Sequence, residues 1–249
     1  MKRTMVITAV ILAGVALLLM VSCSSLERKL LFFPTHRQPD DSLTPWLQAG
    51  RQIGCARVVH TPKNVWLMLH GNGGQAIDRA YAIPCFSSDD SVYILEYPGY
   101  GSRAGKPGKA AFNQAAKEAY LELRRVFPDR PVCVVGESIG SGPASTLTSL
   151  DPPPGKLVLV VPFDQLALVA KAHFPSWLVG LMLTNDWDNV AALRNYRGPV
   201  EIFGAESDEI IPVTHAKALA AGVPGAKFTL IEGGHNEWSH ANRVMIRNP

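Results

Sequence analysis

Residues 132–145 read "VCVVGESIGSGPAS", and this stretch decides the fold class. An apolar run rich in valine, which favours a buried strand, ends at Gly136. Ser138 follows between Gly136 and Gly140, and the next residues are small enough for a helix that packs closely. A strand, a tight turn and a helix would hold the serine in a strained backbone conformation with its hydroxyl exposed. The alternative is an ordinary glycine-rich connection in which the serine has no chemical role.

The rest of the chain alternates apolar runs with helical segments. Strands are expected at 65–70, 91–101, 131–136, 156–163, 199–205 and 227–233, and helices at 109–127, 138–149, 164–172, 214–222 and 237–246. Near-continuous apolar strands alternating with helices predict an α/β fold with a mostly parallel central sheet and helices on both faces. Reactive residues are then expected in the turns that follow the strands.

The histidine that would serve as a base is found by its position. A serine hydroxyl is a weak nucleophile unless a base accepts its proton, and an acid must orient that base. Of the seven histidines, only His70 and His235 stand at the ends of expected strands. His70 leads directly into the glycine-rich stretch 71–74, whereas His235 follows the last expected strand on its own glycine-rich loop. His235 is therefore the expected base.

Three acids compete to orient His235. Asp208 lies just beyond the strand expected at 199–205, Asp164 follows the strand expected at 156–163, and Glu206 is close to Asp208. The chain order Ser138, Asp208, His235 is the order of a known serine triad, which favours Asp208. Asp164 would fit a variant arrangement of the same triad.

The loop 70–74, "HGNGG", is a candidate oxyanion site because its backbone carries few side chains. The backbone N–H groups of Asn72 and Ile139 are the expected donors to a substrate oxyanion. A phosphate-binding loop is the alternative, but the stretch lacks the Lys-Ser/Thr of a P-loop and the spacing of a dinucleotide fingerprint. No set of residues has metal-ligand spacing, so neither a metal nor a cofactor is expected.

Five motifs, taken together, resemble the α/β-hydrolase superfamily over about residues 50–246. They are "HGNGG", "YPGYGSRAGKPG", "GESIGSG", "ESDEIIP" and "GGHN". Within the superfamily they are similar to small α/β-hydrolase-domain proteins that include membrane-linked serine esterases and depalmitoylating enzymes. The resemblance implies Ser138 as nucleophile, Asp208 as acid, His235 as base and an oxyanion loop at Asn72. Pro98 stands where many relatives carry Arg and Ala205 where Gly is frequent, which bears on substrate preference rather than on the triad.

The resemblance also implies a domain plan. Residues 49–249 form the catalytic domain, and residues 164–197 are a short lid of one or two small helices. The lid is apolar, with Phe174, Pro175, Trp177, Leu178, Leu181 and Leu183. These side chains either line an acyl-chain site beside Ser138 or simply cover the edge of the sheet, and the sequence leaves both open.

Residues 1–22 are typical of a lipoprotein signal peptide. Two cations precede an uncharged apolar stretch, 5–21, that is short for a transmembrane helix of about 20 residues. The stretch "LMVSC" resembles a bacterial lipobox and predicts a lipidated Cys23, which would anchor the protein to the membrane of the bacterial cell envelope, facing the periplasm. An uncleaved anchor and ordinary cleavage are the alternatives. Residues 23–48 are expected to be a tether, of which "LLFF" at 30–33 is expected to pack on the domain.

Charge and cysteine content limit other possibilities. The formal net charge is +3 with no basic run, so nucleic-acid binding is not expected. An exported chain permits disulfides, and Cys55 and Cys85 could pair, although the sequence does not decide this. Cys133 lies inside an apolar run and is expected to be a core residue.

The sequence therefore predicts a serine hydrolase that cleaves carboxylic esters or thioesters of small or lipid-like molecules, palmitoyl groups among them, through an acyl-enzyme. A serine peptidase and an acyltransferase on the same fold remain alternatives. A non-catalytic lipoprotein scaffold is the alternative from a different class.

Overall fold

The structure is a computed structural model, and it describes residues 27–38, 41–184 and 186–248. The expected signal peptide at 1–22 and the expected lipidation site Cys23 lie outside the described residues. Within those ranges, no helix has the length and apolar character needed to cross a membrane.

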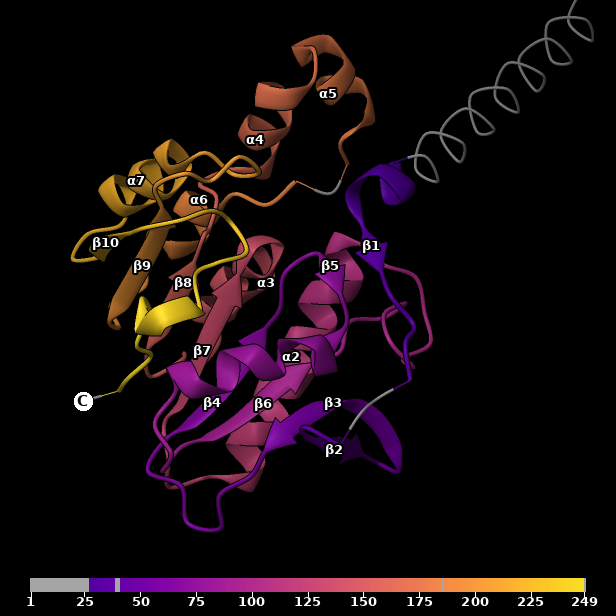
Figure 1. Ribbon diagram of the computed structural model, residues 1–249, viewed down its shortest axis with the longest axis vertical. Helices are drawn as coiled ribbons and strands as arrows, with labels where there is room; N and C mark the ends of the chain where they lie inside the picture. The colour runs from indigo at the N-terminus through magenta and orange to yellow at the C-terminus, as the bar shows by residue number, and fades with distance from the viewer. Residues whose placement is uncertain (1–26, 39–40, 185, 249) are drawn as a thin grey trace, which may run out of the picture.

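The core of the fold is an eight-stranded sheet. In spatial order its strands are β10 (Lys227–Ile231), β9 (Val200–Ala205), β8 (Leu157–Val160), β7 (Val132–Glu137), β4 (Val65–Leu69), β6 (Ser91–Leu95), β3 (Arg51–Arg57) and β2 (Thr44–Gln48). All neighbours from β10 to β6 are parallel, whereas β3 is antiparallel to both β6 and β2 (Figure 1). The expected mostly parallel sheet is confirmed.

The pairing register brings the chemical loops to one edge of the sheet. Leu69 of β4 pairs with Gly136 of β7, so the loop that follows β4 and the turn that follows β7 leave the sheet side by side. The ends of β8 and β9 are in line with them, because Val160 pairs with Phe203. Every residue of β4, β6, β7 and β8 is buried, as expected for strands covered on both faces.

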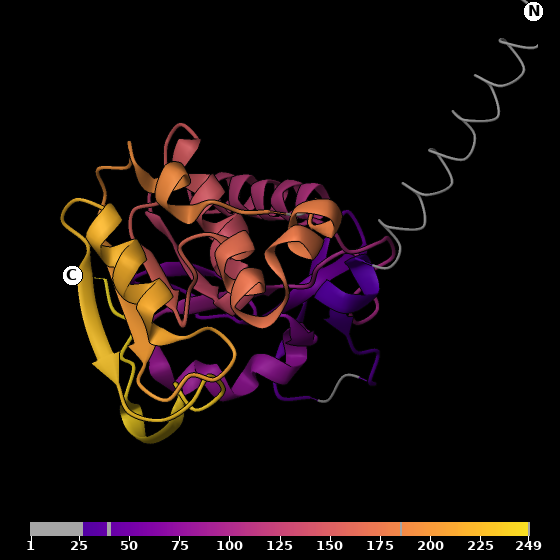
Figure 2. The ribbon, with the colours of Figure 1, turned by 90° about the horizontal axis from the view of Figure 1, so that it is seen from above.

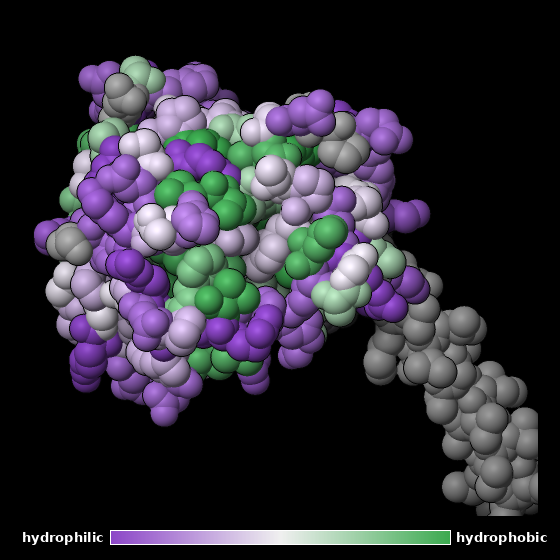
Figure 3. Space-filling model, turned by 90° about the horizontal axis from the view of Figure 1, so that it is seen from below, coloured by the Kyte–Doolittle hydropathy of each residue, from purple (hydrophilic) through white to green (hydrophobic). Residues whose placement is uncertain are grey.

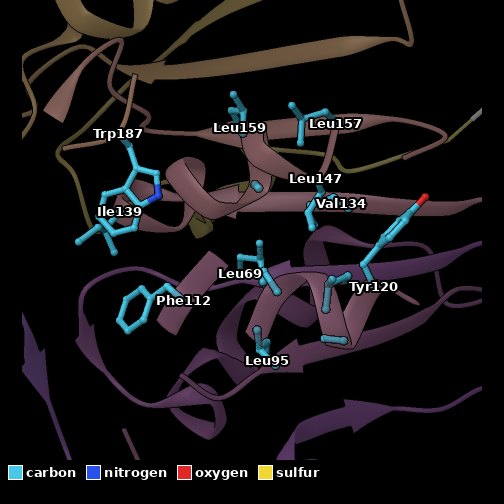
Figure 4. Packing of buried hydrophobic residues seen from close by; sticks show 14 of the residues in the cluster. Leu69, Leu95, Phe112, Tyr120, Val134, Ile139, Leu147, Leu157, Leu159 and Trp187 are labelled. Carbon is cyan, nitrogen blue, oxygen red and sulfur yellow. The ribbon is translucent and has the colours of Figure 1, made fainter. Parts of the chain in front are cut away.

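Helices cover one face, and a mixed layer covers the other. The helical layer comprises α2 (Lys109–Val126), α3 (Ser141–Thr146), α6 (Asn189–Leu193) and α7 (Val213–Gly222). Side chains from three strands, such as Leu69, Val134 and Leu159, share its core with Phe112 of α2 and with Trp187 (Figure 4). The 3-10 helix η1 (Ala76–Cys85) lies on the opposite side of the sheet from α2 (Figure 2).

The prediction of a helix at 237–246 is wrong. Only the short 3-10 helix η4 (His240–Asn242) forms there, and Ala241 within it has a φ of 52°. The apolar side chains Trp238, Val244 and Ile246 are nonetheless buried against the sheet. The backbone N–H of Ile246 donates to the Cys85 carbonyl oxygen at 2.8 Å, so pairing with the end of η1 replaces helical hydrogen bonds.

The helix expected at 138–149 is present but divided into three parts. It begins with the 3-10 helix η2 (Ser138–Gly140), continues as α3 and ends with the 3-10 helix η3 (Leu147–Ser149). The tight first turn follows from the strand-to-helix reversal at the serine.

The segment expected to be a tether contributes to the fold. Residues 27–31 form a helical turn, and β1 (Phe33–Pro34) pairs in parallel with β5 (Gly73–Gly74). β2 joins the main sheet through a hairpin whose two turn residues, Ala49 and Gly50, both have positive φ, 49° and 76°. Two consecutive positive φ angles are those of a type I′ turn. The boundary expected at residue 48 therefore falls inside a β-hairpin.

The lid region at 164–197 contains α4 (Leu166–His173), α5 (Ser176–Met182) and α6, so it holds one helix more than expected. It follows β8 directly and lies over the edge of the sheet where the strands end (Figures 1 and 2). Phe174 and Trp177 are 52% and 72% exposed. Seen from the side opposite to the lid, hydrophobic residues form separate groups among hydrophilic ones (Figure 3), so exposed apolar surface is not confined to the lid.

Cys55 and Cys85 do not form a disulfide with each other. Cys85 and Cys133 are free thiols, and Cys55, Cys85 and Cys133 are all buried. The pairing of Cys55 with Cys85 that the sequence left open is therefore absent, and Cys133 is a core residue as expected.

Candidate active site

Ser138 occupies a strained turn between β7 and α3. Its φ is 53°, in the left-handed region that residues with a side chain rarely adopt. The flanking glycines explain how the turn fits. A Cβ on Gly136 would come within 2.8 Å of the Gly140 carbonyl oxygen, and one on Gly140 would come within 2.1 Å of the Leu69 carbonyl oxygen. Both positions therefore require glycine.

Three side chains from three loops meet at this turn. His235 Nε2 lies 2.9 Å from Ser138 Oγ, and His235 Nδ1 lies 2.7 Å from Asp208 Oδ2. An ionised carboxylate only accepts hydrogen bonds, so Nδ1 carries the imidazole proton and Nε2 is left to accept from the serine hydroxyl. The structure thus brings together the three residues expected to act as nucleophile, base and acid.

Asp208 is held rigidly for its contact with His235. Its other oxygen, Oδ1, accepts from the backbone N–H groups of Ile210 at 2.9 Å and Ile211 at 2.7 Å. Its side chain is only 1% exposed. Because both oxygens are engaged, the carboxylate cannot rotate without losing a hydrogen bond.

The other acids and histidine considered from the sequence lie elsewhere. Asp164 Oδ1 contacts Nδ1 of His215 on α7 at 2.8 Å, not His235. Glu206 is exposed. His70 is fully buried, with Nδ1 2.7 Å from the Gly71 carbonyl oxygen and Nε2 3.5 Å from Glu96 Oε1. None of these residues contacts Ser138.

The expected oxyanion donors lie on adjacent elements. Asn72 follows β4 and Ile139 follows the serine, and these two elements pair at Leu69 and Gly136. Outside helices and strands, no backbone–backbone hydrogen bond of the described residues is donated by the N–H of Asn72.

Glu137 is the central residue that sequence reasoning left without a role. Its carboxylate accepts from Gly71 N at 2.8 Å, Arg79 Nε at 2.9 Å and Tyr81 Oη at 2.8 Å. Trp238 Nε1 adds a fourth contact at 3.2 Å. Burial alone would raise the pKa of Glu137, but the nearby Arg79 charge and these hydrogen bonds lower the pKa to about 2. The side chain is therefore ionised at neutral pH.

Glu137 and Arg79 together support the loop that carries Asn72. Glu137 accepts from the N–H of Gly71, while Arg79 Nη2 donates to the carbonyl oxygens of Gly71, at 3.2 Å, and of Gly73. Burial lowers the pKa of Arg79, but the Glu137 charge outweighs burial and raises it. Glu137 occupies a variable position of the GxSxG pattern, so the motif itself does not predict its role. The one signal in the sequence is an acidic residue in a turn that is expected to be buried.

Two cavities lie close to these elements. A polar cavity of about 270 Å³ is lined by residues that include Asn72, Glu137 and Asn236, which neighbour the triad or the oxyanion loop. An apolar cavity of about 120 Å³ lies between residues 30–31 and the lid side chains Phe174, Leu178 and Leu183. No cluster of three or more His, Cys, Asp or Glu residues that could hold a metal occurs in the described part of the chain.

The comparisons with known proteins agree with the fold. No protein-family model matches the chain. An uncharacterized protein of Mycobacterium tuberculosis is 30% identical over 254 residues, covering 93% of this chain and 86% of that protein. The solved structure of an esterase from Pyrococcus furiosus superposes with a TM-score of 0.59 at 12% identity, covering 83% of this chain and 91% of that one. The chain has an α/β-hydrolase fold.

A more distant relative carries a functional name. The lysophosphatidylserine lipase ABHD12 of Xenopus tropicalis is 29% identical over 187 residues. The match covers 65% of this chain but only 47% of that lipase. An esterase and a lipase are thus among the proteins that this chain resembles.

Proposed function

We propose that the chain is a serine hydrolase that cleaves carboxylic esters or thioesters through an acyl-enzyme, without a cofactor. The observation that carries the proposal is the chain of contacts from Ser138 Oγ to His235 and on to Asp208, at 2.9 and 2.7 Å. The strained backbone at Ser138 supports it, because such strain persists where a turn must present a side chain.

The proposed reaction has two halves. Ser138 Oγ attacks the substrate carbonyl carbon while His235 Nε2 accepts the hydroxyl proton, and the carbonyl oxygen becomes an oxyanion that the N–H groups of Asn72 and Ile139 stabilise. The C–O or C–S bond then breaks, and His235 returns the proton to the leaving alcohol or thiol. In the second half His235 takes a proton from water, the hydroxide attacks the acyl carbon, and Ser138 leaves with the proton.

The proposed substrates are lipid-like, fatty-acyl esters and palmitoyl thioesters included. The apolar cavity between residues 30–31 and the lid supports this class, since the carbonyl oxygen of its lining residue Leu31 accepts a hydrogen bond from Asn72 of the oxyanion loop. The lipase relative acts, by its name, on a lysophospholipid. We also propose that Cys23 carries a lipid that anchors the domain to a bacterial envelope membrane, in line with the "LMVSC" motif.

The proposal is tested with a fluorophosphonate probe, which labels activated serines. The purified protein should be labelled, and Ser138→Ala should lose labelling while its melting temperature is kept. Labelling that persists in Ser138→Ala, or no labelling of the folded wild-type protein, would overturn the proposal; the second outcome would favour the scaffold alternative.

A substrate series then separates the remaining alternatives. The protein should hydrolyse p-nitrophenyl esters of medium or long acyl chains and acyl thioesters faster than peptide anilides. Preference for the anilides would indicate a peptidase, and transfer of the acyl group to an added alcohol at the expense of hydrolysis would indicate an acyltransferase. For the anchor, Cys23→Ala should release the expressed protein from bacterial membranes into the soluble fraction.

A further inference from the structure

The segment Glu27–Thr35, called the brace below, contacts the oxyanion loop directly. Asn72 connects the two. Its side-chain Nδ2 donates to the Leu31 carbonyl oxygen at 2.5 Å, and its Oδ1 accepts from the Phe33 backbone N–H at 3.3 Å. Tyr100 Oη donates to the same Oδ1 at 2.9 Å. Both ends of the amide are therefore engaged, two of the three contacts being with the brace.

Backbone pairing adds to these side-chain contacts. Phe33 and Pro34 of β1 pair with Gly73 and Gly74 of β5, and the N–H of Thr35 donates to the Gly74 carbonyl oxygen at 3.1 Å. The loop needs such support because its glycines have no side chains to fix it by packing. A Cβ on Gly73 would meet nothing within 4 Å.

The brace is itself fixed to the domain at several points. Phe32 is 3% exposed and packs edge-on against Phe112 of α2, with ring centroids 5.2 Å apart. The Glu27 carboxylate accepts from Thr184, which lies just after α5 in the lid, from its N–H at 2.6 Å and its hydroxyl at 2.5 Å. The N–H of Gly101 donates to the Thr35 carbonyl oxygen at 2.9 Å. The brace therefore joins the lid, the core and the oxyanion loop.

From these contacts we infer that the brace is a working part of the active site, in which Asn72 is a positioning residue. The brace and Asn72 hold the loop from one side, while Glu137 and Arg79 hold it from the other. The N–H of Asn72 is fixed between them. This inference rests on the proposed function, because it assigns the loop a part in oxyanion stabilisation.

The brace lies in the N-terminal segment that the sequence predicted to be a tether. Glu27 comes four residues after Cys23, so the brace is joined to the expected lipid anchor by a short stretch of chain and contacts the oxyanion loop through hydrogen bonds. A domain expressed from residue 49 onward, the boundary that the sequence indicates, would lack the brace and should have lowered catalysis.

The test compares Phe33→Pro with Phe33→Ala in the full chain. Proline removes the backbone N–H that donates to Asn72, whereas alanine keeps it and removes only a ring that is 55% exposed. On p-nitrophenyl butyrate, Phe33→Pro should lower kcat about tenfold with KM little changed, because one oxyanion donor loses its position. Phe33→Ala keeps that N–H and should therefore lose less kcat than Phe33→Pro. The affinity for a trifluoromethyl ketone, which forms an oxyanion adduct with Ser138, should fall with kcat.

Asn72→Ala provides an independent variant, since it breaks the same link from the loop side and keeps the backbone N–H. Its kcat should fall by a similar factor, and the Phe33→Pro/Asn72→Ala double variant should lose no more than the larger single loss. Tyr100→Phe removes only the contact that does not involve the brace and serves as its control. It should lose less kcat than Asn72→Ala.

Two outcomes would overturn the inference while leaving the proposed function intact. In the first, Phe33→Pro has the same kcat and the same affinity for the ketone as Phe33→Ala. In the second, the double variant loses kcat by the product of the two single-variant factors. If Phe33→Pro does not fold, as its melting curve would show, an unchanged kcat in Asn72→Ala overturns the inference instead. Failure of the proposed function has a different signature, because wild type and Phe33→Ala would then be as inactive as Ser138→Ala.

Discussion

Two aspartate–histidine pairs lie at the ends of neighbouring strands, and only one of them reaches a serine. Asp208 follows β9 and holds His235 at 2.7 Å, while Asp164 follows β8 and holds His215 at 2.8 Å. The hydrogen bonds are nearly equal, and each uses the Nδ1 atom of the imidazole. The residue types and the distance within the pair therefore do not separate a catalytic pair from a structural one.

The difference lies in what surrounds each pair. Nε2 of His235 meets Ser138 Oγ at 2.9 Å, and the side chain of Asp208 is 1% exposed. His215 lies on α7, and the Asp164 side chain is 12% exposed, so this pair connects the end of β8 to a helix. An aspartate–histidine pair is a candidate for catalysis only when Nε2, the imidazole nitrogen that does not contact the carboxylate, faces a nucleophile on a strained turn.

The largest expected effect comes from removing the nucleophile. Ser138→Ala should lower kcat on p-nitrophenyl esters by about 10⁴-fold or more, because the residual rate comes only from the oxyanion donors and substrate binding. Its melting temperature should not fall, since alanine removes only the hydroxyl. Steady-state kinetics with differential scanning fluorimetry measures both, and a kcat within tenfold of wild type would contradict the role of Ser138.

The next largest effect is expected from a substitution that weakens the Asp208–His235 pair but keeps the size of the Asp208 side chain. Asp208→Asn should lower kcat by about 10³- to 10⁴-fold, because an amide favours the wrong imidazole tautomer and does not stabilise the imidazolium. KM should change little. The measurement is kcat and KM on the same ester, and a loss below tenfold would mean that Asp208 does not orient the base.

The sequence predicted the triad because each member carries a local signal. Ser138 lies between glycines that the turn requires, and Asp208 and His235 directly follow apolar strands. Parallel strands end at one edge of a sheet, so three residues at three strand ends are brought together by topology alone. The central strands were predictable for the same reason, since they are buried on both faces and read as apolar runs.

The parts that could not be predicted depend on long-range contacts. Glu137 looks like a spacer, and its role exists only because Arg79, 58 residues away, folds back onto it. Asn72 meets Leu31 across 41 residues, so a stretch that reads as a tether joins the active site. The C-terminal segment has enough apolar residues for a helix, but pairing of Ile246 with Cys85 holds it in an irregular conformation.

A smaller effect on kcat should follow from Glu137, which supports the site without belonging to either pair. Glu137→Gln leaves the Arg79 guanidinium buried without its counter-charge and should cost about 3–5 kcal/mol of unfolding free energy. Because Gly71 loses its carboxylate acceptor, kcat should also fall by about tenfold. Urea denaturation and ester kinetics measure the two effects. A loss of stability with unchanged kcat would limit Glu137 to a structural role.

The same carboxyl group predicts how stability depends on pH. Its pKa is lowered to about 2 in the folded protein from an ordinary value of 4.5, so its stabilising contribution is complete above about pH 4.5. The contribution is lost as the pH falls from there toward 2, where the folded state also takes up the proton. The difference in unfolding free energy between wild type and Glu137→Gln should therefore be constant from pH 7 to 5 and shrink below pH 4.5. A difference that already shrinks between pH 7 and 5 would show that the pKa of Glu137 is not lowered.

The smallest effect is expected at the second aspartate–histidine pair. Asp164→Asn keeps an acceptor for the N–H of Gln165 and weakens only the contact with His215, so it should cost about 1 kcal/mol of stability and change kcat less than threefold. The variant is the matched control for Asp208→Asn, because both replace a strand-end carboxylate that holds an imidazole. A loss of kcat comparable to that of Asp208→Asn would mean that the two pairs are coupled through the ends of β8 and β9. If Asp164→Asn and Asp208→Asn lost equal kcat, contact with Ser138 would not be what distinguishes the two pairs, since His215 does not contact Ser138.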